Sequence, residues 1–194
     1  MKFRGLFIND EAPALTGWWM KQTNTSVVSF DTDFYKHVFD LLVRLKGNFL
    51  WPAMWGSYVP EPGRMFFVDD PGNMQLAHDY GIVVSTSHHE PMQRASNEMK
   101  EDLTGPWNWV TNKENVVEFM DEGVRRAALN DTYFTLGMRG ENDGPINADD
   151  PVAVLEDVFA TEREILASHY GSEDAVKREF RPRSQTNKTI LFDS

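Results

Sequence analysis

The chain has 194 residues, 41% of them hydrophobic and 25% charged, which is an ordinary composition for a globular protein. Its net charge of −11 and pI near 4.8 argue against binding to nucleic acid or anionic membranes, because no excess of cations is available to neutralise phosphates. It has no cysteine, which excludes disulfides and cysteine-based zinc sites. The residues after Met1 resemble neither a signal peptide nor a membrane span, and the sequence leaves the localisation open.

The first predicted unit is a short strand followed by an amphipathic helix. The strand covers residues 5–8, and the helix covers residues 33–46, where apolar side chains recur at helical spacing. Asp31 or Thr32 is suited to cap the start of this helix, and Gly47 is suited to end it.

Three further units follow the same pattern. A strand at residues 48–51 precedes a short helix at 71–80, which has Asp70 as its cap and Gly81 directly after it. The remaining elements are strands at 82–86 and 133–138 and helices at about 113–129 and 151–170, the last with Asp150 as its cap and Gly171 as its stop.

Short apolar strands that alternate with helices predict an α/β fold with a parallel sheet. A doubly wound sheet and a (β/α)8 barrel both fit this order. No GxGxxG motif or P-loop follows any strand, which disfavours a dinucleotide-binding fold. Polar or aromatic residues follow every strand instead, and barrel enzymes keep their chemistry at that end. We therefore predict a partial TIM-type (β/α)8 barrel of about four βα units.

A closed barrel needs eight strands and typically ~250 residues. We therefore interpret residues 1–178 as the N-terminal half of a (β/α)8 catalytic barrel. Residues 179–194 lack a helical period and carry basic residues in an otherwise acidic chain, so we expect a divergent, disordered tail in which 189–192 form at most a short strand. Half a barrel exposes apolar faces that the other units would cover, which predicts self-association.

Two clusters of polar residues follow the first and third strands. Asn9, Asp10 and Glu11 offer carboxylates and an amide for acid–base work or for binding sugar hydroxyls, or else cap and solvate a loop. His88 and His89 are candidates for binding sugar hydroxyls or a carboxylate, although a histidine in such a place is often structural. Side chains alternate along an extended chain, so we expect one of the two histidines, rather than both, to face the site.

The richest cluster follows the fourth strand, at residues 139–144 (RGENDG). Arg139 could hold a substrate carboxylate with two hydrogen bonds. Asp143 or Glu141 could serve as a general acid. The alternative is an ordinary Asn-Asp-Gly turn with a solvated ion pair.

The six tryptophans are predicted to lie just after strands or in strand-to-helix loops, with none on a helix face. Flat aromatic rings at strand ends suit stacking on sugar rings, and we expect Trp55 to bind substrate in this way. The alternative is that Trp51 and Trp55 simply pack the top of the barrel.

Four segments carry a resemblance to glycoside hydrolase family 115, the α-glucuronidases that act on glucuronoxylan. They are residues 4–15 (RGLFINDEAPAL), 50–55 (LWPAMW), 80–92 (YGIVVSTSHHEPM) and 136–144 (LGMRGENDG). With the helices between them, the resemblance covers about residues 4–178. It implies a (β/α)8 catalytic barrel within a multidomain protein, and full-length relatives that are secreted.

The resemblance implies removal of 4-O-methyl-glucuronic acid, α-1,2-linked to xylose, by inversion and without a metal or other cofactor. The implied partner is glucuronoxylan or its oligosaccharides. Asp143 would be the general acid, with Glu141 a weaker candidate, and Arg139 would bind near the uronic carboxylate. Asn9 and Glu11 would bind substrate, and His88 or His89 would line the site.

The sequence leaves three functional alternatives open. The chain is an α-glucuronidase module in which Glu11 or Glu90 acts as the second carboxylate that inversion requires. Or it is an inactive, truncated product that lacks the general base. Or it is a metal-dependent barrel hydrolase or isomerase that uses Asp10, Glu11, His88 and His89, although no HExxH-type spacing supports a metal site.

Overall fold

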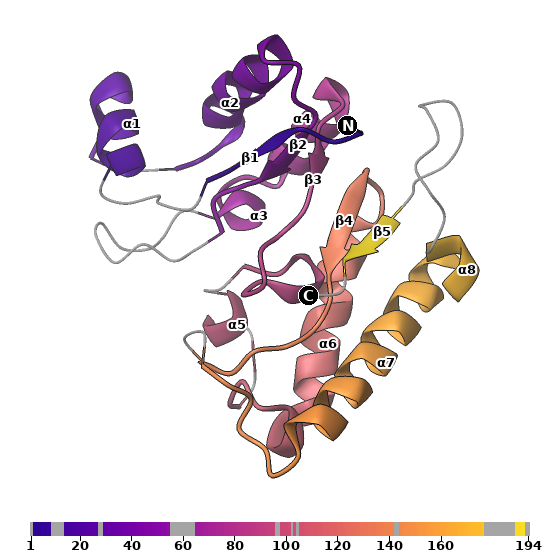
Figure 1. Cartoon of the computed structure of the whole chain (residues 1–194). Helices are drawn as coiled ribbons and strands as arrows, with labels where there is room; N and C mark the ends of the chain where they lie inside the picture. Colours follow the sequence, from indigo (N-terminus) through magenta and orange to yellow (C-terminus); the bar gives the residue numbers. More distant parts are fainter. Residues whose placement is uncertain are drawn as a thin grey trace. The chain divides into compact units, whose positions relative to one another are not determined.

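The structure is a computed structural model. It describes residues 2–8, 14–26, 29–54, 65–95, 98–101, 103, 105–141, 144–176 and 189–192. The chain divides into two compact units, coloured along the sequence in Figure 1. Unit 1 comprises Met1–Ser85 and Ala95–Asn97, and unit 2 comprises Thr86–Arg94 and Glu98–Ser194.

Unit 1 is built on short parallel strands. β1 (Gly5–Phe7) pairs with β2 (Phe49–Trp51), and β2 pairs with β3 (Val83–Val84). The helices described in this unit are α1 (Thr16–Thr23), α2 (Thr32–Arg44), α3 (Phe66–Asp69) and α4 (Gly72–Tyr80). α2 packs against α4, and α4 packs against β3.

The ends of α2 follow from local chemistry. Asp31 caps the start, as predicted, because its Oδ1 accepts a hydrogen bond from the Phe34 amide at 3.1 Å. The left-handed residue after the helix is Lys46, with φ of 59°, and not Gly47. A Cβ at Gly47 would force the Leu42 side chain to shift and would lie 3.1 Å from the Leu42 carbonyl oxygen, so the position favours glycine for space instead. The glycine therefore marks the helix end, but for a different reason from the one that the sequence indicated.

An aromatic cluster forms the core of unit 1. Phe30 stacks on Phe34 with ring centroids 4.1 Å apart, and Tyr35 meets the edge of Phe66 at 4.7 Å. All four side chains are buried. The Tyr35 hydroxyl accepts a hydrogen bond from the Ala53 amide at 3.1 Å, just past the end of β2. The core therefore also fixes the chain that leaves the strand.

Two consecutive carboxylates join the start of α2 to the start of α4. Asp69 accepts from the Phe30 amide at 2.7 Å, and Asp70 accepts from the amides of Thr32 at 3.1 Å and Gly72 at 2.8 Å. The amide of Gly72, followed by that of Thr32, holds the pKa of Asp70 below its usual value. Asp70 thus has the capping role that was predicted for it.

Unit 2 contains a parallel strand pair and two long helices. β4 (Thr132–Thr135) pairs with β5 (Thr189–Phe192). The described helices are the 3-10 turn η2 (Pro91–Gln93), α5 (Glu98–Glu101), α6 (Trp109–Ala127), α7 (Pro151–Tyr170) and α8 (Glu173–Val176). α6 and α7 pack along each other (Figure 1).

The capping residues predicted both ends of α7 but not the start of α6. α7 begins and ends where predicted, with the Asp150 carboxylate accepting from two amides of the first turn and Gly171 left-handed at φ of 86°. α6 begins four residues before its predicted start at 113. Asn108 caps it, because its Oδ1 accepts from the amides of Val110 and Thr111.

One prediction about local structure needs correction, and the predicted tail is described only in part. No helix was expected at α1, which contains Trp18 and Trp19, so the prediction that no tryptophan lies on a helix is wrong. Thr189–Phe192 forms the four-residue strand β5 in parallel with β4, in the stretch that was expected to form at most a short strand. Residues 177–188 and 193–194, the rest of that tail, lie outside the described residues.

The fold class is as predicted. Strands and helices alternate along the chain, and strand pairing is parallel within each unit. This is an α/β architecture consistent with a partial barrel of about four βα units. None of the described helices is long and apolar enough to cross a membrane.

A carboxylate on α7 ties that helix to the first turns of α6. Asp157 accepts hydrogen bonds from the Trp109 indole at 2.8 Å and from the Lys113 ammonium at 2.7 Å. The Lys113 ammonium also lies 5.2 Å from the centre of the Trp109 ring. Lys113, followed by Trp109, holds the pKa of Asp157 below its ordinary value of 3.8.

We expect Asp157→Asn to destabilise unit 2 at neutral pH, by less than ~1 kcal/mol because the pair is exposed to solvent. A carboxyl group whose pKa is lowered in the folded state contributes its full stabilisation at pH values above the unfolded-state pKa of 3.8. That contribution is lost as the pH falls below this value, through the folded-state pKa. Urea unfolding at pH 7 and at pH 3 measures the difference, which should shrink at pH 3. The exposed neighbour Glu156→Gln is the control, and an equal loss there would contradict the assignment.

Candidate functional site

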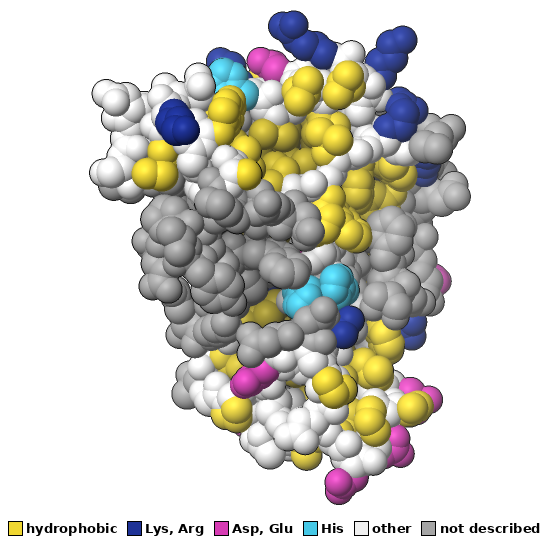
Figure 2. Space-filling model, turned by 60° about the vertical axis from the view of Figure 1, so that its left-hand side comes forward, with side chains coloured by type: hydrophobic (Ala, Val, Ile, Leu, Met, Phe, Trp, Pro, Cys, Tyr) yellow, Lys and Arg dark blue, Asp and Glu magenta, His cyan; other side chains and the backbone are white. Residues whose placement is uncertain are grey.

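The residues after β3 form a tight turn that carries both histidines. The Glu90 amide donates to the Ser87 carbonyl at 3.0 Å. The rings of His88 and His89 lie against each other, with centroids 4.3 Å apart and planes tilted by 50°. Side-chain alternation does not apply inside a turn, so the expectation that one histidine rather than both faces the site loses that basis and stays a prediction. His88 is exposed and His89 is half-buried, and histidine side chains reach the molecular surface in Figure 2.

Hydroxyl groups fix the first half of this turn. The Thr86 hydroxyl donates to the Glu90 carbonyl at 2.6 Å, and the Ser87 hydroxyl donates to the Glu90 carboxylate at 2.5 Å. The Thr135 hydroxyl of β4 donates to the Thr86 carbonyl at 2.5 Å. Glu90 is fully buried. Its carboxylate is enclosed within the turn, which suits a structural role better than activation of a water at the surface.

The loop after β4 is closed by its glycines. The Gly140 amide donates to the Gly144 carbonyl, and the Gly144 amide donates to the Glu141 carbonyl, both at 2.9 Å. A Cβ at Gly140 would lie 2.1 Å from the Pro145 carbonyl oxygen, so only glycine fits there. The loop presents Arg139 and Glu141 on either side of Gly140, and both are exposed.

Two contacts anchor this loop to the rest of unit 2. The buried Glu162 of α7 accepts a hydrogen bond from the Gly137 amide at 2.8 Å, where the backbone is left-handed with φ of 106°. The Trp107 indole donates to the Arg139 carbonyl at 2.9 Å and meets the Phe119 ring at 5.9 Å. The backbone of Arg139 is therefore held from the segment that precedes α6.

The structure brings some of the predicted site residues together. His88 and His89 share one turn, and Arg139 and Glu141 share one loop, all within unit 2. The other predicted residues, Asn9, Glu11, Trp55 and Asp143, lie outside the described residues. Within the described part of the chain, no three His, Asp or Glu side chains gather to hold a metal ion. Asp10 and Glu11 of the metal alternative are outside that part as well.

Sequence reasoning missed the two residues that follow the histidine turn in the chain and support it. Met92 and Gln93 are both fully buried and both left-handed, with φ of 54° and 64°. The Gln93 amide group donates to the Thr132 hydroxyl at 2.6 Å and to the Tyr133 carbonyl at 2.5 Å, both in β4. No sequence signal marks a methionine or a glutamine for this conformation, which only tertiary contacts maintain.

Polar residues at the carboxyl ends of parallel strands in an α/β fold define the class of site found in barrel enzymes. Comparisons with known proteins identify the family. The sequence model of glycosyl hydrolase family 115 matches residues 1–181, and the chain belongs to this family.

A solved structure of a family 115 4-O-methyl-α-glucuronidase, with specificity for decorated arabinogalactans, is similar to this chain. The two share 32% sequence identity, with a TM-score of 0.74. The match covers 87% of this chain and 22% of that one, so the chain spans about a fifth of the length of that enzyme. No curated protein sequence matches the chain.

α6 packs closely against Met92, which follows the histidine turn, and a substitution can test this packing. A Cβ at Gly123 would lie 2.3 Å from the Met92 carbonyl oxygen, which is backbone and cannot swing aside. We expect Gly123→Ala to lower the free energy of unfolding by about 1–3 kcal/mol, through overpacking. Urea unfolding followed by circular dichroism measures this loss.

Gly17→Ala is the matched control, because nothing lies within 4 Å of a Cβ there. Alanine favours a helix over glycine, so stability should stay level or rise by up to ~1 kcal/mol. An unchanged midpoint for Gly123→Ala would show that the segment yields to the methyl group.

Proposed function

We propose that the chain forms part of the active site of an α-glucuronidase, which releases glucuronic acid or its 4-O-methyl ether from a polysaccharide. The observation that carries the proposal is the closed loop after β4, which presents Arg139 and Glu141 in a member of glycosyl hydrolase family 115. The similar 4-O-methyl-α-glucuronidase supports a substrate that bears glucuronic acid.

Arg139 is proposed to bind the carboxylate of the uronic acid. A guanidinium stays charged at any working pH and can donate two parallel hydrogen bonds to a carboxylate. The Trp107 indole fixes the Arg139 carbonyl, so the side chain starts from a defined point of the backbone. The acidic chain would otherwise repel an anionic sugar at close range.

The proposed mechanism is inverting hydrolysis, with Asp143 as general acid and Glu141 as the weaker candidate. Inversion needs a second carboxylate as base, about 6.5–9.5 Å from the acid, to leave room for the attacking water. Glu90 is disfavoured as the base because its carboxylate is buried within the histidine turn and accepts a hydrogen bond from Ser87. Glu11 is then the proposed base from this chain, and without it the chain would bind substrate and not turn it over.

Glucuronoxylan or its oligosaccharides are the proposed substrate, with decorated arabinogalactan as the comparison that the similar enzyme suggests. Asn9, Glu11 and Trp55 are proposed to contact the sugar, together with His88 or His89. The exposed His88 is the histidine better placed to reach a ligand.

The decisive assay is release of (4-O-methyl)-glucuronic acid from both polysaccharides by the wild-type chain. We expect Asp143→Asn to lower kcat by about 10²–10⁴-fold through loss of proton donation. Arg139→Met should chiefly raise KM, or weaken binding of glucuronic acid if turnover is absent. Asp149→Asn, an exposed carboxylate nearby, is the control. Folded protein that neither releases nor binds glucuronic acid would rule the proposal out.

We also propose that the isolated chain self-associates through apolar side chains of unit 1. Leu6, Phe7, Leu41 and Leu45 are each at least 42% exposed, and hydrophobic side chains gather on the face drawn in Figure 2. Sedimentation velocity should show a mass that rises with concentration. Leu41→Lys with Leu45→Lys should reduce this rise, whereas a wild-type monomer at all concentrations would contradict the proposal.

A further inference from the structure

We propose that Arg126 is a positioning residue for the proposed site, acting with Glu98 to fix the turn that carries His88 and His89. Arg126 lies near the end of α6 and reaches the residue that ends η2. The inference rests on the proposed function only where it concerns turnover. The effect of Arg126 on the geometry of the histidine turn stands on contacts within unit 2.

The backbone that follows the histidine turn is strained and needs external support. Met92 and Gln93 occupy the left-handed region, which residues with a Cβ rarely adopt, and they do so in succession. Both are fully buried, so water cannot satisfy their polar groups. A strained buried segment persists only when its surroundings determine its conformation.

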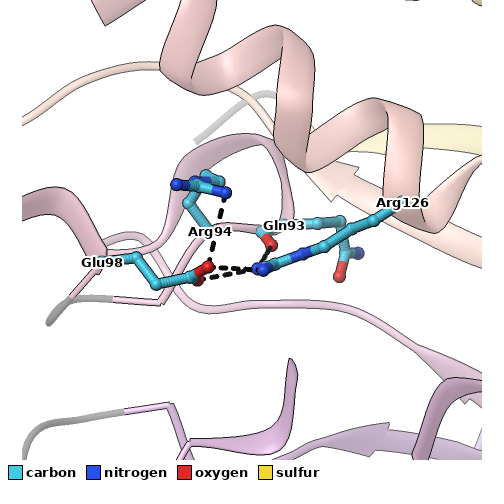
Figure 3. A network of polar contacts seen from close by, with 4 residues as sticks. All are labelled: Gln93, Arg94, Glu98 and Arg126. Carbon is cyan, nitrogen blue, oxygen red and sulfur yellow. Dashed lines mark hydrogen bonds and ion pairs between the residues drawn. The ribbon is translucent and has the colours of Figure 1, made fainter. Parts of the chain in front are cut away.

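Arg126 supplies that support at the strained residue itself. One guanidinium nitrogen donates to the Gln93 carbonyl at 2.6 Å and to the Glu98 carboxylate at 2.7 Å, and the other donates to Glu98 at 2.5 Å (Figure 3). The flat guanidinium thus holds a carbonyl and a carboxylate in one fixed geometry, which an ammonium group cannot reproduce.

A second arginine completes the network. Arg94 is 3% exposed, contacts Glu98 at 3.3 Å, and places its guanidinium 3.8 Å from the centre of the Phe119 ring. Glu98, itself 7% exposed, is shared between the two cations. Burial makes each of these interactions stronger than it would be in water, and loss of one partner leaves a buried charge poorly matched.

The two histidines lie on one short segment, residues 86–93, which is anchored at both ends, and the Arg126 network forms the second anchor. Thr135 holds the carbonyl of Thr86 at its start, and Arg126 holds the carbonyl of Gln93 at its end. Between these anchors, Pro91 removes a backbone torsion and the Glu90 carbonyl is fixed by the Thr86 hydroxyl. Release of the Gln93 carbonyl would let the strained residues relax, and the turn that precedes them would shift.

The test uses imidazole NMR spectra of the full chain, which contains five histidines. His88→Asn and His89→Asn variants assign the two signals of interest. We expect Arg126→Met to shift both signals and to weaken the ring-to-ring nuclear Overhauser contact. The signal of His169 should stay in place, because its Nε2 lies 2.8 Å from Asp121 Oδ1 and reports that α6 and α7 remain packed.

Arg125→Met is the matched control. It removes the adjacent arginine of the same helix, which is exposed and paired with Asp121, and it should leave the signals of His88 and His89 unchanged. Arg126→Lys keeps the charge but loses the planar pair of guanidinium donors, so it should shift both signals by a smaller amount than Arg126→Met does. If Arg126→Met moves His169 as well, the helices have lost their packing, and the Arg126→Lys spectrum then decides the question. Unchanged His88 and His89 signals in a folded variant overturn the inference.

Kinetics separate the two proposals. If the wild-type chain releases uronic acid, Arg126→Met should lower kcat by about 10- to 100-fold with little change in KM, as expected for small misplacement of groups near the reacting bond. An unchanged kcat beside shifted histidine signals would overturn the catalytic part of the inference. Absence of both turnover and glucuronic acid binding in the wild type would count against the proposed function, and the NMR result would still decide the positioning role.

Discussion

The backbone of residues 86–94, which is buried except around His88 and His89, imposes the constraint on which the candidate site of unit 2 depends. This segment leaves the end of β3 and turns sharply inside the protein, where no sheet ladder satisfies its backbone. Side chains from elsewhere in unit 2 satisfy it instead, with Thr135 at one end and Arg126 at the other. A buried carbonyl without a partner costs more free energy than a typical hydrogen bond contributes, so these donors matter beyond their number.

This constraint explains several residues that lie outside the proposed site. Gly123 lets α6 approach the Met92 carbonyl, and the bulk of any side chain would push the helix away. Glu98 balances part of the charge that Arg94 and Arg126 bring into the interior. The same logic holds at the second loop, where buried Glu162 serves the Gly137 amide. In both places a charged group on a neighbouring element takes over a task that regular secondary structure performs elsewhere.

The order of elements could be predicted because it depends on local signals. Asp31, Asp70 and Asp150 each accept hydrogen bonds from the first turn of the helix they precede, as their positions indicated. Helix α1 was missed because it lacks an acidic cap and a clear apolar stripe, and Trp19 secures it through a bond to the distant Ser29 carbonyl. The left-handed pair Met92 and Gln93 was also missed, since contacts from β4 and α6 create that conformation.

The positions of His88 and Arg139 after β3 and β4 could likewise be predicted, while the contact between the two histidine rings could not. Parallel strands deliver their ends to one edge, which is why His88 and Arg139 were selected. Alternation along a strand does not describe how the two histidine rings meet, because the chain has already left the strand and entered a turn. The role proposed for Arg139, by contrast, follows from the charge of the chain. In a chain of net charge −11, a repelled anionic sugar needs a cation at contact distance, and repulsion from charges farther than about 8–10 Å is screened at physiological salt. In the proposed function, Arg139 supplies this cation from a short loop in which only glycine fits at residue 140 and the Trp107 indole fixes the Arg139 carbonyl.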